Sequence, residues 1–163
     1  MVCGARWRAE DADIIEGDLE DTRAAYTAGD HEKEFRLLKP LAEQGNSEAQ
    51  MVLGVMHEKG EGVAEDDAKA VYWYRKAAEQ GDDGAQQALG EMYLKGEGVP
   101  QNLVKAYAWM NIATAQAHEI LMKPILEKYK SFVEKRMTPE QIAKGQELAA
   151  EYWEKYVVPF QKD

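Results

Sequence analysis

The sequence predicts an all-α solenoid, and two observations carry this prediction. The first is a stretch that occurs twice, at residues 45–78 and 81–114, so that a shift of 36 positions superimposes the two copies. The second is that glycines divide each copy into two segments of helix length. Self-similarity at this period is typical of helical solenoids, in which each unit buries its apolar face only by stacking on its neighbours. The superimposed pairs include Ala49 and Ala85, Leu53 and Leu89, Gly54 and Gly90, Gly60 and Gly96, and Trp73 and Trp109.

Composition narrows the classes of protein and partner. The 163 residues suit one domain, and a hydrophobic fraction of 45% is ordinary for a globular protein. The net charge of −10 repels phosphate backbones, so nucleic acid is not expected as a partner. The single cysteine, Cys3, excludes an intramolecular disulfide and a multi-cysteine zinc site.

The N-terminal residues lack the features of a targeting segment. No apolar run follows the arginines Arg6 and Arg8, so no secretory signal is expected, and no window of about 20 apolar residues predicts a membrane-spanning helix. Cys3 is interpreted as an incidental terminal thiol, with a lipidation site on a processed protein as the alternative.

Residues 1–16 are predicted to be an acidic, poorly ordered N-terminus, and residues 17–44 a degenerate capping unit. Apolar residues Ile14, Ile15 and Leu19 place a stripe on a first helix that reaches about residue 28, and a second helix is expected from about residue 31 to residue 44. Seven acidic residues crowd this region: Glu10, Asp11, Asp13, Glu16, Asp18, Glu20 and Asp21.

The repeat units are expected at residues 45–80 and 81–116, each starting with a capping box. Ser47 with Gln50, and Asp83 with Gln86, have the spacing of the two side chains in such a box. The first helix of each unit then ends in Gly-x-Gly-Val, at residues 60–63 and 96–99, where glycine accepts the left-handed conformation of a helix C-cap.

The second helix of each unit is expected to begin near Asp66 or Asn102, both good N-cap residues. Within each of these helices, the spacing of the apolar residues predicts a buried face. Its members are Ala70, Trp73, Tyr74 and Ala77 in one unit and Ala106, Trp109, Met110 and Ala113 in the next. Gly45 and Gly81 follow Glu-Gln and close the preceding helices.

These residues carry a resemblance to a known family. The pattern is Ala49-Gln50-x-x-Leu53-Gly54-x-x-His57-x-x-Gly60-x-Gly62-Val63, then Lys69-Ala70-x-x-Trp73-Tyr74-x-Lys76-Ala77-Ala78-Glu79-Gln80-Gly81, and it recurs 36 residues later. It resembles the Sel-one-like repeat, a relative of the tetratricopeptide repeat. The resemblance implies a right-handed α-α superhelix of about seven helices and a bacterial source. Two departures are that His57 stands where the family has the tyrosine kept at Tyr93, and that Thr22-Arg23 replaces the Leu-Gly pair in the first unit.

Residues 117–163 are expected to form a C-terminal helical cap like those of similar bacterial proteins. An amphipathic helix over residues 118–136 is started or kinked by Pro124, with apolar positions at Ile120, Leu121, Ile125, Tyr129, Phe132 and Val133. Thr138-Pro139-Glu140-Gln141 then predicts a capped helix that runs to about residue 157. Its polar outer face consists of Lys144, Glu147, Glu151, Glu154 and Lys155.

The sequence supplies no catalytic set, metal site or cofactor motif. His31, His57 and His118 lie far apart in the sequence, and residues of a solenoid meet only within one repeat or between adjacent repeats. His57, Glu58 and Glu61 are poor metal ligands because adjacent helical side chains diverge. The Gly60–Val63 loop lacks the lysine and hydroxyl residue of a phosphate loop.

The candidate site is a groove lined by the first helices of successive units, as the resemblance to helical-repeat proteins implies. Met51, Val55 and Leu94 lie off the Ala-Leu-Gly stripe, so they are either half-buried lining or an adaptable groove floor. The groove residues expected are Glu48, Met51, Val55, Glu58 and Lys59 from residues 45–80, and Gln87, Glu91, Leu94 and Lys95 from residues 81–116.

The resemblance implies a non-catalytic scaffold or adaptor, a monomer that binds a protein or peptide and does not insert into membranes. It favours the periplasm or secretion, with the cytoplasm as the alternative. Two other functions stay open. One is a toxin-neutralising immunity protein. The other is a penicillin-binding or hydrolase-type enzyme, as linked to the cysteine-rich branch of the family, although this chain lacks the paired cysteines of that branch.

Overall fold

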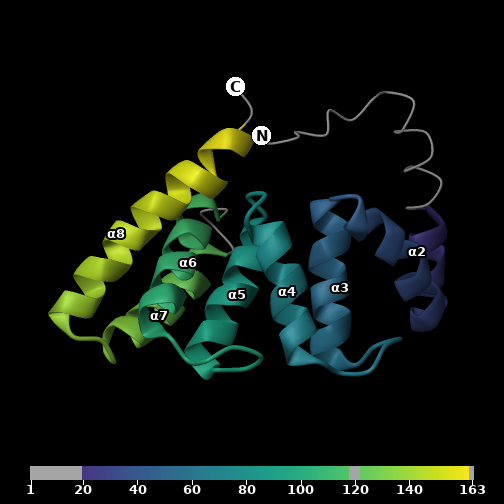
Figure 1. Ribbon diagram of the computed structural model, residues 1–163, viewed down its shortest axis with the longest axis horizontal. Helices are drawn as coiled ribbons and strands as arrows, with labels where there is room; N and C mark the ends of the chain where they lie inside the picture. The colour runs from purple at the N-terminus through teal and green to yellow at the C-terminus, as the bar shows by residue number, and fades with distance from the viewer. Residues whose placement is uncertain (1–19, 118–121, 162–163) are drawn as a thin grey trace.

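A computed structural model describes residues 20–117 and 122–161, and these ranges are helical with short connections and contain no strand (Figure 1). Counting the helical segment at residues 20–27, the described chain has eight α-helices, close to the seven expected. The others are α2 (His31–Glu43), α3 (Ser47–Lys59), α4 (Asp67–Ala78), α5 (Asp83–Lys95), α6 (Leu103–Gln116), α7 (Lys123–Glu134) and α8 (Pro139–Tyr156), followed by the short helix η1 (Val158–Phe160).

Helices that follow one another in the chain pack side by side, which is the arrangement of a solenoid. Contacts join α2 to α3, α3 to α4, α4 to α5 and α5 to α6, while α6 also contacts α7 and α8. Figure 1 shows α2 at one end of this row and α8 at the other. The all-α prediction is confirmed.

The second helix of each unit begins at an N-cap that recurs every 36 residues. Asp30, Asp66 and Asn102 each accept a hydrogen bond at 3.0 Å from the backbone N–H three residues later. The prediction for Asp66 and Asn102 is confirmed. Because Asp30 is in the same register, the second helix of the first unit, α2, corresponds residue by residue to α4 and α6.

The N-caps of α3 and α5 lie one residue earlier than the sequence predicts. The capping side chains are those of Asn46 and Asp82, which accept from the N–H groups of Ala49 and Ala85 at 2.8 Å. Ser47 and Asp83 are the first helical residues instead. The predicted capping boxes at these two helices are therefore wrong.

The glutamines assigned to those boxes tie neighbouring helices together instead. The buried amide of Gln50 donates to the carbonyl of Ala42 at 2.9 Å, and its oxygen accepts from Gln80 at 2.7 Å. The same arrangement recurs 36 residues later with Gln86, Ala78 and Gln116, at 3.3 and 2.6 Å. Buried polar groups left without partners are costly, so each glutamine fixes the spacing between one unit and the next.

The Gly-x-Gly loops end α3 and α5 as predicted. Gly60 and Gly96 are left-handed C-caps, with φ of +67° and +78°. The second glycine of each loop is required for a different reason, namely its close approach to another part of the backbone. A Cβ on Gly62 would lie 2.1 Å from the carbonyl oxygen of His31, so the loop presses against the start of α2 and only glycine fits.

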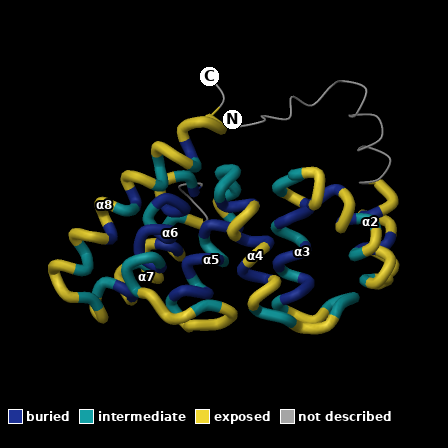
Figure 2. The backbone as a smooth tube through the Cα atoms, in the orientation of Figure 1, coloured by how far each residue is buried: buried dark blue, intermediate teal, exposed yellow. Residues whose placement is uncertain are grey.

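The core runs between α3 and α6, where Figure 2 shows most of the buried positions. The Ala-Leu-Gly stripes and both tryptophans are buried, as expected: Trp73 is 9% and Trp109 3% exposed. Gly54 lets α3 and α4 approach closely, because a Cβ there would lie 2.4 Å from the ring of Tyr74.

The C-terminal cap follows the prediction at α8 and departs from it at α7. Thr138 and Gln141 form the expected capping box, and Pro124 lies in the first turn of α7. The buried face of α7 is Leu126 and Val133. The apolar residues Ile125, Tyr129 and Phe132 were expected on that face but are exposed, because they lie beside the Leu126 and Val133 stripe that packs on α6.

α8 covers α6 through an aromatic cluster. The ring of Trp109 packs on Tyr152 and Tyr156, with centroid distances of 4.4 and 5.6 Å. The outer face predicted for this helix is exposed at all five positions. Expectations for residues 1–16, Cys3, Leu19, His118, Ile120 and Leu121 lie outside the described residues.

Candidate binding surface on the first helices of the units

Two hollows lie on the first helices of three successive units, and they meet at Met51. The smaller has a volume of about 250 Å³ and is formed by α3, α4 and α5. Five of the nine residues named from the sequence line it: Met51, Glu58, Gln87, Glu91 and Lys95. Tyr74, Gly84, Ala88 and Met92 complete the wall.

The chemistry of the smaller hollow is polar and acidic. The hydroxyl of Tyr74 donates to the carboxylate of Glu58, and the amide of Gln87 donates to Glu91 at 3.0 Å. Burial, reinforced by the hydrogen bond to Glu58 and by the charge of Glu91, raises the pKa of Tyr74, so its phenol stays a hydrogen-bond donor. Two carboxylates and one ammonium group, that of Lys95, leave this hollow with a negative balance.

Lys95 lies at the end of α5 within reach of several carboxylates. Burial lowers the pKa of Lys95. The carboxylate of Glu97, 3.4 Å from the ammonium nitrogen, and the charges of Glu91 and Glu58 raise this pKa by more, so the net shift is upward. The ammonium group therefore stays charged at neutral pH and exposed at the rim.

The larger hollow, of about 460 Å³, lies between the helical segment 20–27, α2 and α3. Three of the expected groove residues line it: Glu48, Met51 and Val55. The remaining lining residues are Thr22, Arg23, Tyr26, Glu34, Leu38, Ala49 and Val52. Its floor is apolar, and its charged groups are Arg23, Glu34 and Glu48.

The larger hollow exists because the first unit cannot close as the repeats do. Hydrogen bonds from Asp30 N to Ala25 O and from Glu61 N to Met56 O place Arg23 at the position of Gly54. At Gly54 even a Cβ would collide with Tyr74. In the first unit, Arg23 and the smaller Leu38, which occupies the register position of Tyr74, both line the hollow.

Two of the nine expected residues line neither hollow. Lys59 is exposed at the end of α3. Leu94 is half-buried and packs against the core clusters around Trp109 and Tyr107. The other seven are brought to the two hollows.

Three features of the sequence point to lining residues that the groove prediction does not include. Tyr74 was expected only in the core, yet its hydroxyl reaches the smaller hollow. Thr22 and Arg23, which also line the larger hollow, stand where the repeats have Leu-Gly. Glu34 stands where the two repeats have Ala70 and Ala106, and the 36-residue shift alone would have singled it out.

The described residues contain no group of three or more His, Cys, Asp or Glu side chains that could hold a metal ion. Over the same ranges, no helix combines the length and the apolar character needed to cross a bilayer.

Comparisons with known proteins agree with this architecture. The family model of the Sel1 repeat matches residues 47–82 and 84–118. The protective antigen c5321, present in uropathogenic Escherichia coli strains and displaying an SLR fold, is 31% identical with a TM-score of 0.79, over 88% of this chain and 30% of that protein. A Sel1 repeat protein from Oxalobacter formigenes is 30% identical with a TM-score of 0.58, over 63% of this chain and 28% of that protein. No curated protein matches the sequence.

This chain thus spans about a third of the length of the solved structures it resembles. The helix pairs, the 36-residue register and both matches of the repeat model agree with one another. The chain carries two Sel1 repeats on an SLR-type helical solenoid.

Proposed function

We propose that the chain is a non-catalytic scaffold or adaptor that binds a protein or peptide across the first helices of its units. The observation that carries this proposal is the pair of hollows that meet at Met51. Helical-repeat proteins use extended surfaces of this kind for partner binding, because successive units present equivalent side chains side by side.

The two hollows differ in chemistry, which favours a partner with two different contact residues. The larger has an apolar floor, and the smaller presents Glu58, Glu91 and the Tyr74 hydroxyl. Binding energy at protein interfaces concentrates in a few residues that fill such pockets. Met51, which contributes to both walls, is the residue on which we expect binding to depend most.

The test is capture of a partner by the intact chain, followed by titration calorimetry with the purified partner. Changing Met51→Ala together with Gln87→Ala should weaken binding by about 2 kcal/mol or more, since both side chains face the hollows. Leu94 is left unchanged because it packs against the core. The control is Lys144→Ala on the exposed outer face of α8, which should bind like the unaltered chain.

Circular dichroism on each variant separates lost binding from lost folding. Full affinity in a folded double variant would show that the binding site does not lie on the first helices. The exposed face of α8 would then be the next surface to change.

A further inference from the structure

The first unit contains a buried carboxylate where the repeats have a methyl group. The register set by Asp30, Asp66 and Asn102 aligns Glu34 with Ala70 and Ala106. Both alanines are fully buried, and Glu34 is only 5% exposed. Burial of a carboxylate is costly unless hydrogen bonds or an opposite charge compensate it.

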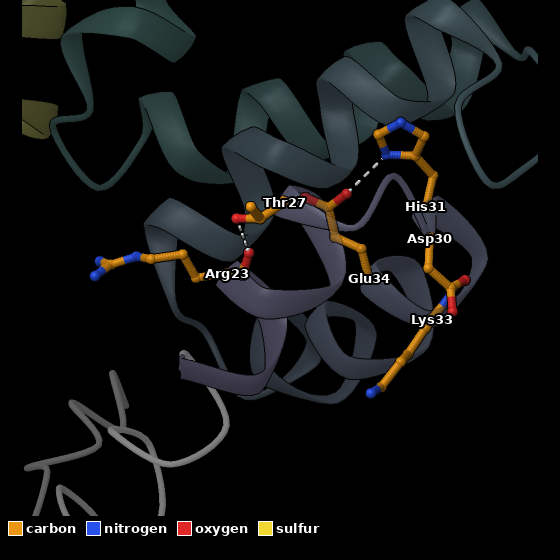
Figure 3. Close-up of polar contacts among 6 residues, drawn as sticks. All are labelled: Arg23, Thr27, Asp30, His31, Lys33 and Glu34. Atoms are coloured by element: carbon orange, nitrogen blue, oxygen red, sulfur yellow. Dashed lines mark hydrogen bonds and ion pairs between the residues drawn. The ribbon is translucent and has the colours of Figure 1, made fainter.

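The neighbours of Glu34 compensate this carboxylate only in part. The Nδ1 atom of His31 lies 3.0 Å from one carboxylate oxygen, and this is the ion-pair contact that Glu34 makes among the described residues (Figure 3). An ionised carboxylate has about four acceptor positions on its two oxygens. One imidazole nitrogen fills one of them.

Neither Lys33, the preceding residue, nor Arg23, which lines the same hollow, forms an ion pair with Glu34. Figure 3 shows the guanidinium of Arg23 and the ammonium of Lys33 pointing away from its carboxylate. The hydroxyl of Thr27 is engaged elsewhere, since it donates to the carbonyl of Arg23 at 2.8 Å. The carboxylate of Glu34 therefore lines the larger hollow without a lysine or arginine of its own.

The rest of the hollow is mostly apolar. Leu38, Ala49, Val52 and Val55 form its floor, and its volume of about 460 Å³ lies in the range of small-ligand sites. Glu48 adds a second carboxylate to the lining. An apolar floor that leads to buried negative charge matches a side chain with a methylene stem and a cationic end.

We propose that the hollow between residues 20–27, α2 and α3 binds a lysine side chain of the protein or peptide partner, with its methylene stem on Val52 and Val55 and its ammonium group at Glu34. This proposal rests on the proposed function for the identity of the partner as a protein. Its test uses small probes, so that its outcome does not depend on the partner.

The probes are Nα-acetyl-lysine methylamide and its norleucine counterpart, which has the same four-carbon stem without the amine. Binding to the full chain is followed by NMR chemical shifts of the methyl groups of Leu38, Val52 and Val55. We expect the lysine probe to bind at least fivefold more tightly than the norleucine probe. An arginine probe, whose planar end demands a different geometry, should bind more weakly than lysine.

The matched variants are Glu34→Gln and Glu32→Gln. Both remove one negative charge from α2, but Glu32 is exposed and does not line the hollow. Glu34→Gln should abolish the preference for lysine and keep norleucine binding, whereas Glu32→Gln should leave the preference intact. Retained norleucine binding also shows that the variant is folded around the hollow.

Three results would overturn the proposal: equal binding of the two probes, a lysine preference that survives in Glu34→Gln, or tighter binding of the arginine probe. Each of these would leave the proposed scaffold function standing, because partner binding across Met51 is measured separately. Partner binding that does not depend on Met51, found together with an intact lysine preference, would instead reject the proposed scaffold surface alone.

Discussion

The two repeats differ in their packing at His57 and its counterpart Tyr93. It is 4% exposed, lies edge-on to Phe35 with ring centroids 5.7 Å apart, and its Nδ1 atom has no hydrogen-bond partner. Its counterpart Tyr93 is also buried, but its hydroxyl accepts a hydrogen bond from Arg75 at 2.9 Å. The first repeat therefore holds a titratable ring where the second holds a satisfied phenol.

Burial lowers the pKa of His57 below its ordinary value of 6.5, against the opposing effect of a hydrogen bond to the backbone of Ala64. The unfolded chain then binds this proton more readily than the folded chain. The contribution of neutral His57 to stability is complete above about pH 6.5 and is lost as the pH falls toward the folded-state pKa.

We therefore expect His57→Tyr to make stability less sensitive to acid. Between pH 7.5 and pH 5, the free energy of unfolding should fall more for the unaltered chain than for the variant, as measured by urea denaturation. His31 and His118 are present in both proteins, so the comparison isolates the effect of His57. Parallel pH profiles would show that folding does not lower the pKa of His57, which would contradict the effect expected from its burial.

At the scale of the helix, the approach of α3 to α4 depends on a single missing Cβ. The ring of Tyr74 occupies the space that a side chain at Gly54 would need. The first unit gives the contrasting case, because Arg23 at the equivalent position accompanies an open hollow.

Gly54→Ala should destabilise the chain by about 1–2 kcal/mol, because overpacking outweighs the better helix propensity of alanine. Gly84→Ala is the matched control, since a Cβ there meets only ordinary contacts, 3.4 Å from Asp82 Oδ1 and 3.5 Å from the Met51 methyl. We expect the control to be neutral or slightly stabilised in chemical denaturation. Equal midpoints for the two variants would contradict the close packing of α3 on α4.

The C-cap glycines Gly60 and Gly96 and the second-helix caps could be predicted from sequence because each follows from local backbone chemistry. Gly60 must be left-handed, and Asp66 needs only the backbone of its own first turn. The sequence pattern predicts the first-helix caps one residue too late, because the glutamine that suggests each capping box bonds to the preceding helix instead. Gln50 bonds to Ala42 in the preceding helix, and no local pattern distinguishes that bond from a capping box.

The candidate site was predictable to the extent that it follows the repeat. Residues at equivalent positions of α3 and α5 line the hollows. Leu94 instead packs against the core, because α6 and the C-terminal cap cover that side of α5. The exposed apolar residues of α7 were misplaced for a similar reason. Helical spacing fixes which residues share a face, and only the packing of α6 decides which face is buried.

At the scale of the whole molecule, the units are linked by contacts that repeat. The bonds of Gln50 and Gln86 and the close approach of Gly62 to His31 each connect one unit to its neighbour. The first helices of the three units are thereby held beside one another as one surface, with Met51 at the junction of its two hollows. This shared surface is where we propose that a partner binds.

Hydrogen exchange of the intact chain, with and without its captured partner, tests that claim most directly. Exposed and half-buried surface that becomes covered by a partner should exchange more slowly. We predict slower exchange in α3, α5 and residues 20–27, with α7 and α8 unchanged. Protection confined to α7 or α8, with α3 and α5 unaffected, would contradict the account.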